Sequence, residues 1–199
     1  MSGRVTDIEV NPKEPTEFYV AYASGGLWHT VNNGTTFNPI FDNANTQNIG
    51  DFDIDWNNRI IVVGTGENNS SRSSYSGIGI LRSIDNGKNW ENIGLTDSHH
   101  IGKVKINPND PNEIIVGVLG HLYSTNMQRG IFKTIDGGNN WINITNALPY
   151  KTISYIAVHP TEENRVWITF SGYTSGEKVY SSIDGGLNWQ NISGTLPNI

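Results

Sequence analysis

The amino-acid sequence predicts an all-β protein built from four repeated units, and two observations support this. The first is a motif with the pattern Ser/Thr-x-Asp-x-Gly-x-x-Trp at residues 83–90, 134–141 and 182–189, with a diverged copy at 30–37. These copies begin 53, 51 and 48 residues apart, and a fixed period of this length is typical of stacked repeats. The second observation is a composition with 22 glycines, 6 tryptophans and 8 tyrosines, which favours β-structure.

Each residue type in the motif suits a tight hairpin. Asp-Gly, Asp-Asn and Asn-Gly pairs tolerate the positive φ of such a turn, and the carboxylate can accept backbone N–H groups of its own turn. The closing Trp is large enough to fill the space between neighbouring sheets. A catalytic role for these aspartates is disfavoured because the same acid recurs in every unit. We therefore expect a structural role for Ser83, Asp85, Gly87, Trp90, Thr134, Asp136, Gly138, Trp141, Ser182, Asp184, Gly186 and Trp189.

The chain order supports four strands in each unit. The first strands are expected at 5–10, 49–54, 101–106 and 153–158, and the second, apolar on both faces, at 18–23, 60–65, 114–119 and 166–170. The third are expected at 26–30, 79–83, 130–134 and 178–182, and the fourth at 36–40, 89–93, 140–144 and 188–192. Four antiparallel strands repeated about every fifty residues form the blade of a β-propeller. We predict a single propeller domain over 1–199, with blades at about 1–46, 47–98, 99–149 and 150–199.

The repeated hairpins resemble the Asp-box, or BNR, repeats of sialidases, xyloglucan-cleaving glycoside hydrolases and sortilin-type receptor domains. The segments Ala-Ser-Gly-Gly-Leu-Trp at 23–28, Gly-Thr-Gly-Glu-Asn-Asn at 64–69 and Leu-Gly-His-Leu at 119–122 further resemble bacterial secreted proteins of the sortilin-like branch. The resemblance covers the whole chain and implies a secreted or cell-surface location. Relatives usually carry seven or more blades. With four blades, three arrangements are open: a small closed ring, an open arc, or two chains that together complete a larger ring. A fragment, or a partial propeller that forms a homodimer, is the preferred interpretation.

Composition excludes several classes of function. The net charge is −6 and no run of Lys or Arg is present, which argues against a nucleic-acid partner. No apolar stretch is long enough to span a membrane, and no signal peptide follows Met1. The chain has no cysteine, so it has neither disulfides nor thiolate chemistry.

The candidate binding residues lie in the loops between second and third strands and between blades, which should share one face of the propeller. Polar and aromatic side chains around a concave opening suit a peptide or a glycan, although they can also serve only to order their own loops. The residues that we assign to ligand binding are Glu67, Asn68, Arg72, Tyr75, His100, His121 and Arg129. No cofactor is expected, and a metal site built from His99, His100 and His121 near Glu67 is disfavoured because their spacing matches no known ligand pattern.

The sequence favours a binding module over an enzyme. In the xyloglucan-cleaving relatives a catalytic Asp precedes the Gly-Gly of the first blade by two positions, where this chain has Ala23. Glu67, paired with Asp97 or Glu177, is the remaining candidate for catalysis, supported only by its loop position. We therefore predict a non-catalytic interaction module for peptide, protein or polysaccharide; the alternative is a glycoside hydrolase or a fragment of one.

Overall fold

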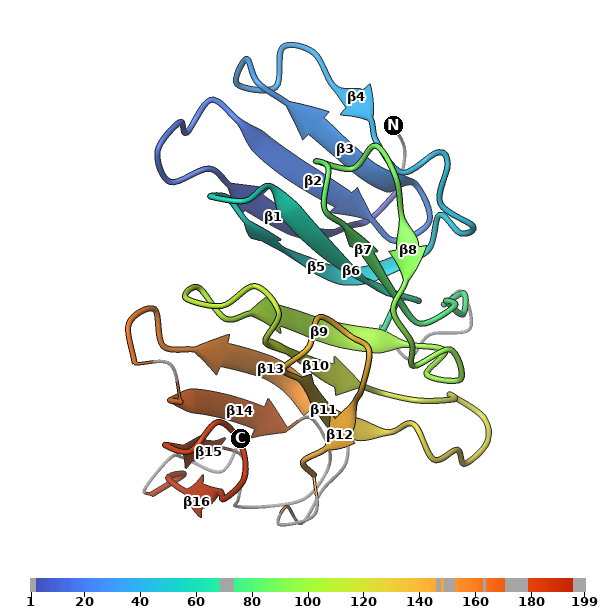
Figure 1. The fold of residues 1–199 in the computed structure, drawn as a ribbon. Coiled ribbons are helices and arrows are strands. Elements are labelled where there is room, and N and C mark those ends of the chain that lie inside the picture. The colour runs from blue at the N-terminus through green and yellow to red at the C-terminus, as the bar shows by residue number, and fades with distance from the viewer. Residues whose placement is uncertain are drawn as a thin grey trace.

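A computed structural model of the chain confirms the predicted all-β propeller architecture (Figure 1). The structure describes residues 3–68, 74–145, 148, 153–162, 164–170 and 179–194. Within these residues there are four antiparallel sheets of four strands, and no helix is formed. Accordingly, no helix of the described residues is long and apolar enough to cross a membrane.

In the two N-terminal sheets, each strand pairs with the next one along the chain. The first sheet contains β1 (Val5–Val10), β2 (Phe18–Tyr22), β3 (Gly26–Thr30) and β4 (Asn38–Pro39). The second contains β5 (Ile49–Asp55), β6 (Ile60–Thr65), β7 (Ile80–Ser83) and β8 (Glu91–Asn92).

The two C-terminal sheets repeat this order. The third sheet contains β9 (Ile101–Ile106), β10 (Ile114–Val118), β11 (Gly130–Thr134) and β12 (Ile142–Asn143). The fourth contains β13 (Ile153–Val158), β14 (Val166–Phe170), β15 (Val179–Ser182) and β16 (Gln190–Asn191).

The outer strands are shorter than the five residues predicted for each. In the second sheet β8 is limited to Glu91 and Asn92, which lie opposite Arg82 and Leu81 of β7. The preceding backbone N–H groups of Lys88 and Asn89 donate instead to the carboxylate of Asp85, at 3.1 and 2.9 Å. These backbone N–H groups are therefore not available for hydrogen bonds to β7, so the outer strand begins later than predicted.

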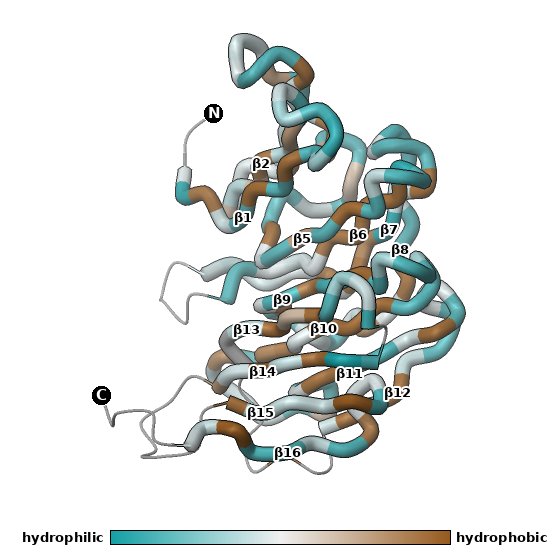
Figure 2. The backbone as a smooth tube through the Cα atoms, turned by 90° about the vertical axis from the view of Figure 1, so that its left-hand side faces the viewer, coloured by the Kyte–Doolittle hydropathy of each residue, from teal (hydrophilic) through white to brown (hydrophobic). Residues whose placement is uncertain are grey.

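The four sheets are stacked in chain order, with the first and last at opposite ends (Figures 1 and 2). This chain alone therefore forms an open arc. Hydrophobic clusters fill the spaces between the sheets: one lies between the first and second, one between the second and third, and one between the third and fourth. The strands β6 and β10 are buried at every position, as predicted for strands that are covered on both faces. In contrast, β14 alternates between buried and half-buried residues because one face of the last sheet is uncovered.

The Asp hairpins fasten each sheet to the one before it. Asp136 Oδ1 accepts hydrogen bonds from the Thr134 hydroxyl at 2.7 Å and from the Asn140 backbone N–H at 2.9 Å. The Trp141 indole N–H then donates to the Ile93 carbonyl of the preceding sheet at 2.7 Å. A Cβ on Gly138 would lie 2.6 Å from the Ile93 Cβ, so glycine is required where the hairpin meets that sheet. The equivalent indole donations run from Trp90 to Ile40 and from Trp189 to Ile144.

Candidate functional site

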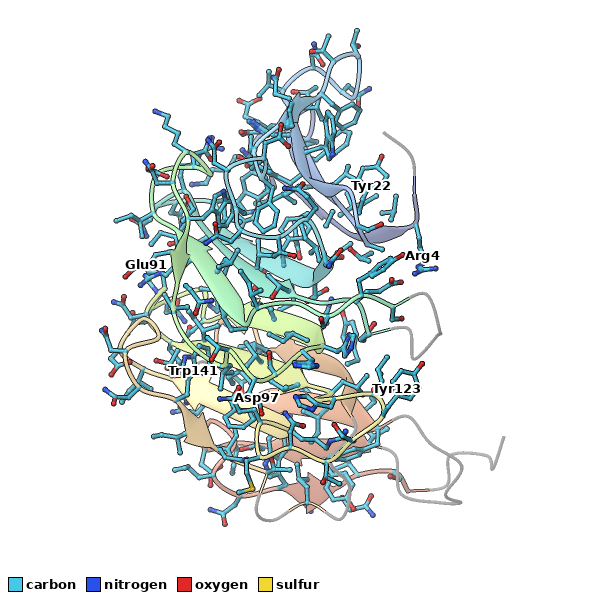
Figure 3. The ribbon with its side chains drawn as sticks, turned by 90° about the vertical axis from the view of Figure 1, so that its right-hand side faces the viewer. Arg4, Tyr22, Glu91, Asp97, Tyr123 and Trp141 are labelled. Carbon is cyan, nitrogen blue, oxygen red and sulfur yellow. The ribbon has the colours of Figure 1, made fainter. Side chains whose placement is uncertain are left out.

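Three loops meet at a pocket on the face opposite the Asp hairpins, as the loop assignment predicted. The loops join β6 to β7, β8 to β9 and β10 to β11. The pocket has a volume of about 400 Å³, and its lining residues are Ser74, Tyr75, Ser76, His99, His100, His121, Leu122, Tyr123 and Ser124. We call it the loop pocket. Figure 3 labels Asp97 and Tyr123 in this layer of loops.

Two tyrosines of the loop pocket are largely exposed to solvent. Tyr75 is 62 % exposed and Tyr123 is 83 % exposed. Exposed aromatic side chains beside a polar pocket offer flat apolar area together with a hydroxyl, which suits a peptide side chain or a sugar ring.

Beside the tyrosines, Asp97 and two histidines form a compact group. The Asp97 Oδ1 atom lies 3.0 Å from His121 Nε2, and this hydrogen bond lowers the pKa of Asp97. The His99 ring stacks on the His121 ring with a centroid distance of 3.7 Å. Each of these residues offers one metal-ligating atom, and the three atoms lie within 4.8 Å of one another. The sequence analysis grouped His121 with His99, His100 and Glu67 as a disfavoured metal site; the structure instead places Asp97 beside His99 and His121.

His100 is buried and points away from this group. Its Nδ1 atom lies 2.7 Å from the Glu67 backbone carbonyl oxygen, and burial lowers the pKa of His100 to about 4. The His99 and His100 rings are 6.3 Å apart and nearly perpendicular, because neighbouring residues project in different directions. At neutral pH His100 is therefore a neutral residue that holds the loop in place.

The remaining predicted residues differ in how they are engaged. Glu67 is only 2 % exposed and forms an ion pair with Arg4, so its carboxylate is not displayed to solvent. Arg129 donates to the His121 carbonyl at 2.6 Å, which braces the loop. Asn68 lies against Gly102 at the base of the loop. Arg72 and Glu177 lie outside the described residues.

A charged layer on the innermost strands was missed by the sequence analysis. Asp51 on β5 is buried, with Oδ1 2.7 Å from Lys103 Nζ and Oδ2 accepting the Val104 backbone N–H at 2.7 Å. Burial raises the pKa of Asp51, and Lys103 opposes that effect. Asp7 on β1 lies 3.6 Å from the same ammonium.

The same arrangement recurs two residues further along these strands. Asp53 accepts the Ile106 backbone N–H at 2.7 Å, and both Asp53 and Glu9 lie 3.1 Å from Lys105 Nζ. Burial alone would lower the pKa of Lys105, but Asp53 and Glu9 raise it. The signal in the sequence is a charged pair at i and i+2 in the first strand of three successive units. This layer holds the inner strands together, and its charges are paired within the chain.

The comparisons with known proteins agree on the fold. The family model Sortilin-Vps10 (sortilin, neurotensin receptor 3) matches residues 79–197. No curated protein matches the chain. Among solved structures, an ancestral GH74 enzyme aligns with a TM-score of 0.68 and 21 % identity, covering 98 % of this chain and 24 % of that one.

Two further structures extend the range of similar proteins. The GH74 xyloglucanase from Xanthomonas campestris aligns with a TM-score of 0.72 and 17 % identity, over 99 % of this chain and 31 % of that one. A structure of YCF48 bound to D1 peptide aligns with a TM-score of 0.63 and 16 % identity, over 100 % of this chain and 57 % of that one. The chain thus spans about a quarter to a third of the GH74 structures and just over half of the YCF48 structure. At these identities the similarity establishes the fold.

Proposed function

The chain belongs to the Sortilin-Vps10 family, and from that premise we propose that it is a non-catalytic interaction module that binds its ligand through the loop pocket. The observation that carries this proposal is the pair of exposed tyrosines, Tyr75 and Tyr123, at a pocket of about 400 Å³ formed by three separate loops. Such a surface offers apolar contact area surrounded by hydrogen-bonding groups, as ligand sites commonly do.

A peptide is the ligand class that we favour, with a protein segment or a polysaccharide as the other members of the proposal. The structure of YCF48 with D1 peptide is a precedent for peptide binding by a protein of this fold. Ser74, Ser76 and Ser124 line the pocket and add polar groups suited to a peptide backbone. The family resemblance makes a secreted or cell-surface location part of the same proposal.

The carboxylates near the pocket argue against catalysis. Glycoside hydrolysis needs two carboxyl groups about 5–10 Å apart, one of which acts as an acid. Glu67 is buried against Arg4, and Asp97 forms a hydrogen bond with His121. Ala23 stands where the xyloglucan-cleaving hydrolases have a catalytic Asp. The alternative, a glycoside hydrolase or a fragment of one, therefore rests on the shared fold with GH74 enzymes.

A binding assay and an activity assay separate these two functions. We expect peptides on an array to bind the wild-type chain and to lose at least about tenfold in affinity with Tyr75→Ala or Tyr123→Ala, since each removes a large contact surface. The matched control is Ile183→Ala, which shortens an exposed apolar side chain on an Asp hairpin. The activity assay measures the release of reducing sugar from xyloglucan. If the wild type releases sugar and Glu67→Gln does not, the proposal is overturned in favour of the hydrolase.

The open ends of the arc support the proposed homodimer. Val5, Ile8 and Val10 on β1 are about half exposed, so the first sheet presents apolar side chains where a closed ring would cover them. A second copy could cover this surface and complete a larger ring. Light scattering should give twice the mass of one chain, and Ile8→Asp should reduce it to that of one chain. A single-chain mass for the wild type at high concentration would contradict the dimer.

A further inference from the structure

We infer that Asp97, His99 and His121 form a binding site for one divalent transition-metal ion of the zinc type. This goes beyond the proposed function, which uses no metal, and it contradicts the expectation from the sequence that the chain has no metal site. The observation is geometric: one carboxylate oxygen and two imidazole nitrogens, from two different loops, lie within 4.8 Å of one another.

The donor set selects the class of metal. Two imidazoles and one carboxylate suit Zn²⁺, Cu²⁺ or Ni²⁺, whereas Ca²⁺ and Mg²⁺ prefer oxygen ligands alone. Zinc is bound at about 2.0–2.2 Å in a tetrahedron, which places neighbouring donors about 3.3 Å apart. Asp97 Oδ1 and His121 Nε2, at 3.0 Å, are already close to that separation.

Polar groups around the cluster orient two of its members. The Ser124 hydroxyl lies 2.8 Å from His121 Nδ1, so the other ring nitrogen, Nε2, faces Asp97. The Asn126 amide donates to the Asp97 backbone carbonyl at 2.6 Å and lies 3.4 Å from Oδ2. Partners of this kind fix ligand orientation in metal sites and contribute to affinity.

His99 is held at the cluster by its backbone. It has a φ of 54°, in the left-handed region, and its carbonyl accepts the Gly77 N–H at 2.6 Å. A Cβ on Gly66 would clash with the same carbonyl, so glycine at position 66 allows the two loops to touch. The His99 ring stacks on His121 with an interplanar angle of 26°, and ligation requires the rings to tilt further apart.

The site opens into the loop pocket, because His99 and His121 both line it. Three protein donors leave one position of a tetrahedral ion for water or for an atom of a ligand. The ion would thus be accessible from solvent without any rearrangement of the sheets.

Calorimetric titration of the full chain with zinc chloride at pH 7.5 tests the site. We expect saturable one-to-one binding, and Asp97→Asn, His99→Gln and His121→Gln should each lower the affinity at least about tenfold. Ser124→Ala, which removes only the partner of His121, should give a smaller loss. The Co²⁺ complex should show the visible absorption of a tetrahedral ion, and His121→Gln should abolish it.

The control is His159→Gln, because His159 also lies beside a carboxylate, with its Nε2 atom 3.5 Å from Glu162 Oε1. It should leave zinc affinity unchanged, and circular dichroism should show that every variant is folded. Undiminished binding by the Asp97→Asn, His99→Gln and His121→Gln triple variant, or no binding by the wild type, would overturn the inference. Because the probe is the metal alone, failure here leaves the loop-pocket proposal standing, and failure of peptide binding leaves the metal site standing.

Discussion

The Asp53 carboxylate on β5 accepts a hydrogen bond from the Ile106 backbone N–H on β9 at 2.7 Å. A side chain of the second sheet thereby accepts a hydrogen bond from the innermost strand of the third sheet. Asp51 repeats the contact with Val104. The inner strand of a blade is a sheet edge, whose donors need a partner when they are buried. The charged layer supplies that partner and therefore connects the second and third sheets at the centre of the arc.

Replacing Asp51 should destabilise the fold strongly. Asp51→Ala leaves Lys103 without its nearest partner and the Val104 N–H without its acceptor. We expect a loss of about 3 kcal/mol in the free energy of unfolding, the lower end of the range for breaking a buried pair, since Asp7 remains near Lys103. Denaturant unfolding measures this. The exposed Asp42→Ala is the control and should stay within about 0.5 kcal/mol of the wild type. A loss below about 1 kcal/mol for Asp51→Ala would show that the layer contributes little.

The Trp of the Asp hairpin should contribute through both packing and its N–H. Trp141→Ala removes a large side chain that packs against the cluster between the second and third sheets, at a cost of about 3–5 kcal/mol. Trp141→Phe keeps much of the packing but loses the hydrogen bond to Ile93, and should cost distinctly less. The exposed Ile135→Ala in the same hairpin is the control. Equal losses for Ala and Phe would mean that packing of the indole is unimportant.

Acid should weaken the Asp hairpins in a defined pH window. Hydrogen bonds from Asn140 lower the pKa of Asp136 to about 2, and Asp85 and Asp184 are lowered to about 2 in the same way. A folded-state pKa below the ordinary value of 3.8 means that the stabilisation is present above about pH 4 and is lost as pH falls towards 2.

The Asp136→Asn variant isolates this effect, because it mimics the amide that Asn32 naturally supplies in the first hairpin. Its melting temperature should be lower than that of the wild type at pH 7, and the difference should shrink between pH 4 and pH 2. The exposed Asp42→Asn should show no such trend. A difference that is constant with pH would contradict the assigned hydrogen bonds.

Gly66 should be intolerant of any side chain. Its φ is 83°, and a Cβ would meet the backbone carbonyl of His99. A Gly→Ala change stabilises a protein by up to about 1 kcal/mol where the backbone conformation suits alanine, and it destabilises by more than that where it does not. We therefore expect Gly66→Ala to lower the free energy of unfolding by more than about 1 kcal/mol. It should also displace His99 and weaken zinc binding. Thermal melts measure the first effect, with Asp42→Ala at an exposed position as the control. A melting temperature equal to that of the wild type would contradict the close contact between the two loops.

Much of the fold was predictable because its signals are local. The Ser83 hydroxyl donates to Asp85 Oδ1 at 2.8 Å and accepts the Gly87 N–H at 2.8 Å, as the pattern of residue types indicates. The second strands of the second and third units, β6 and β10, were also found, since burial on both faces produces continuous apolar runs. The predicted length of the outer strands was wrong, because the carboxylate of the hairpin binds backbone N–H groups that would otherwise pair with the neighbouring strand.

The candidate site was predicted only in part. Loop position identified Tyr75 and His121 as ligand-binding candidates, and both line the loop pocket. Loop position also suggested a catalytic Glu67, whose carboxylate is buried against Arg4. Burial of a loop residue depends on what packs over it, and the sequence gives no measure of that.

The sequence by itself determined the repeat, the Asp hairpins and the order of strands, because turn chemistry and hydrophobic periodicity act between residues close together in the chain. Only the tertiary structure decided which charges meet across the inner strands and that Asp97, His99 and His121 converge. These contacts join segments more than twenty residues apart, so they depend on how the sheets and loops pack and not on any pattern between residues close in the chain.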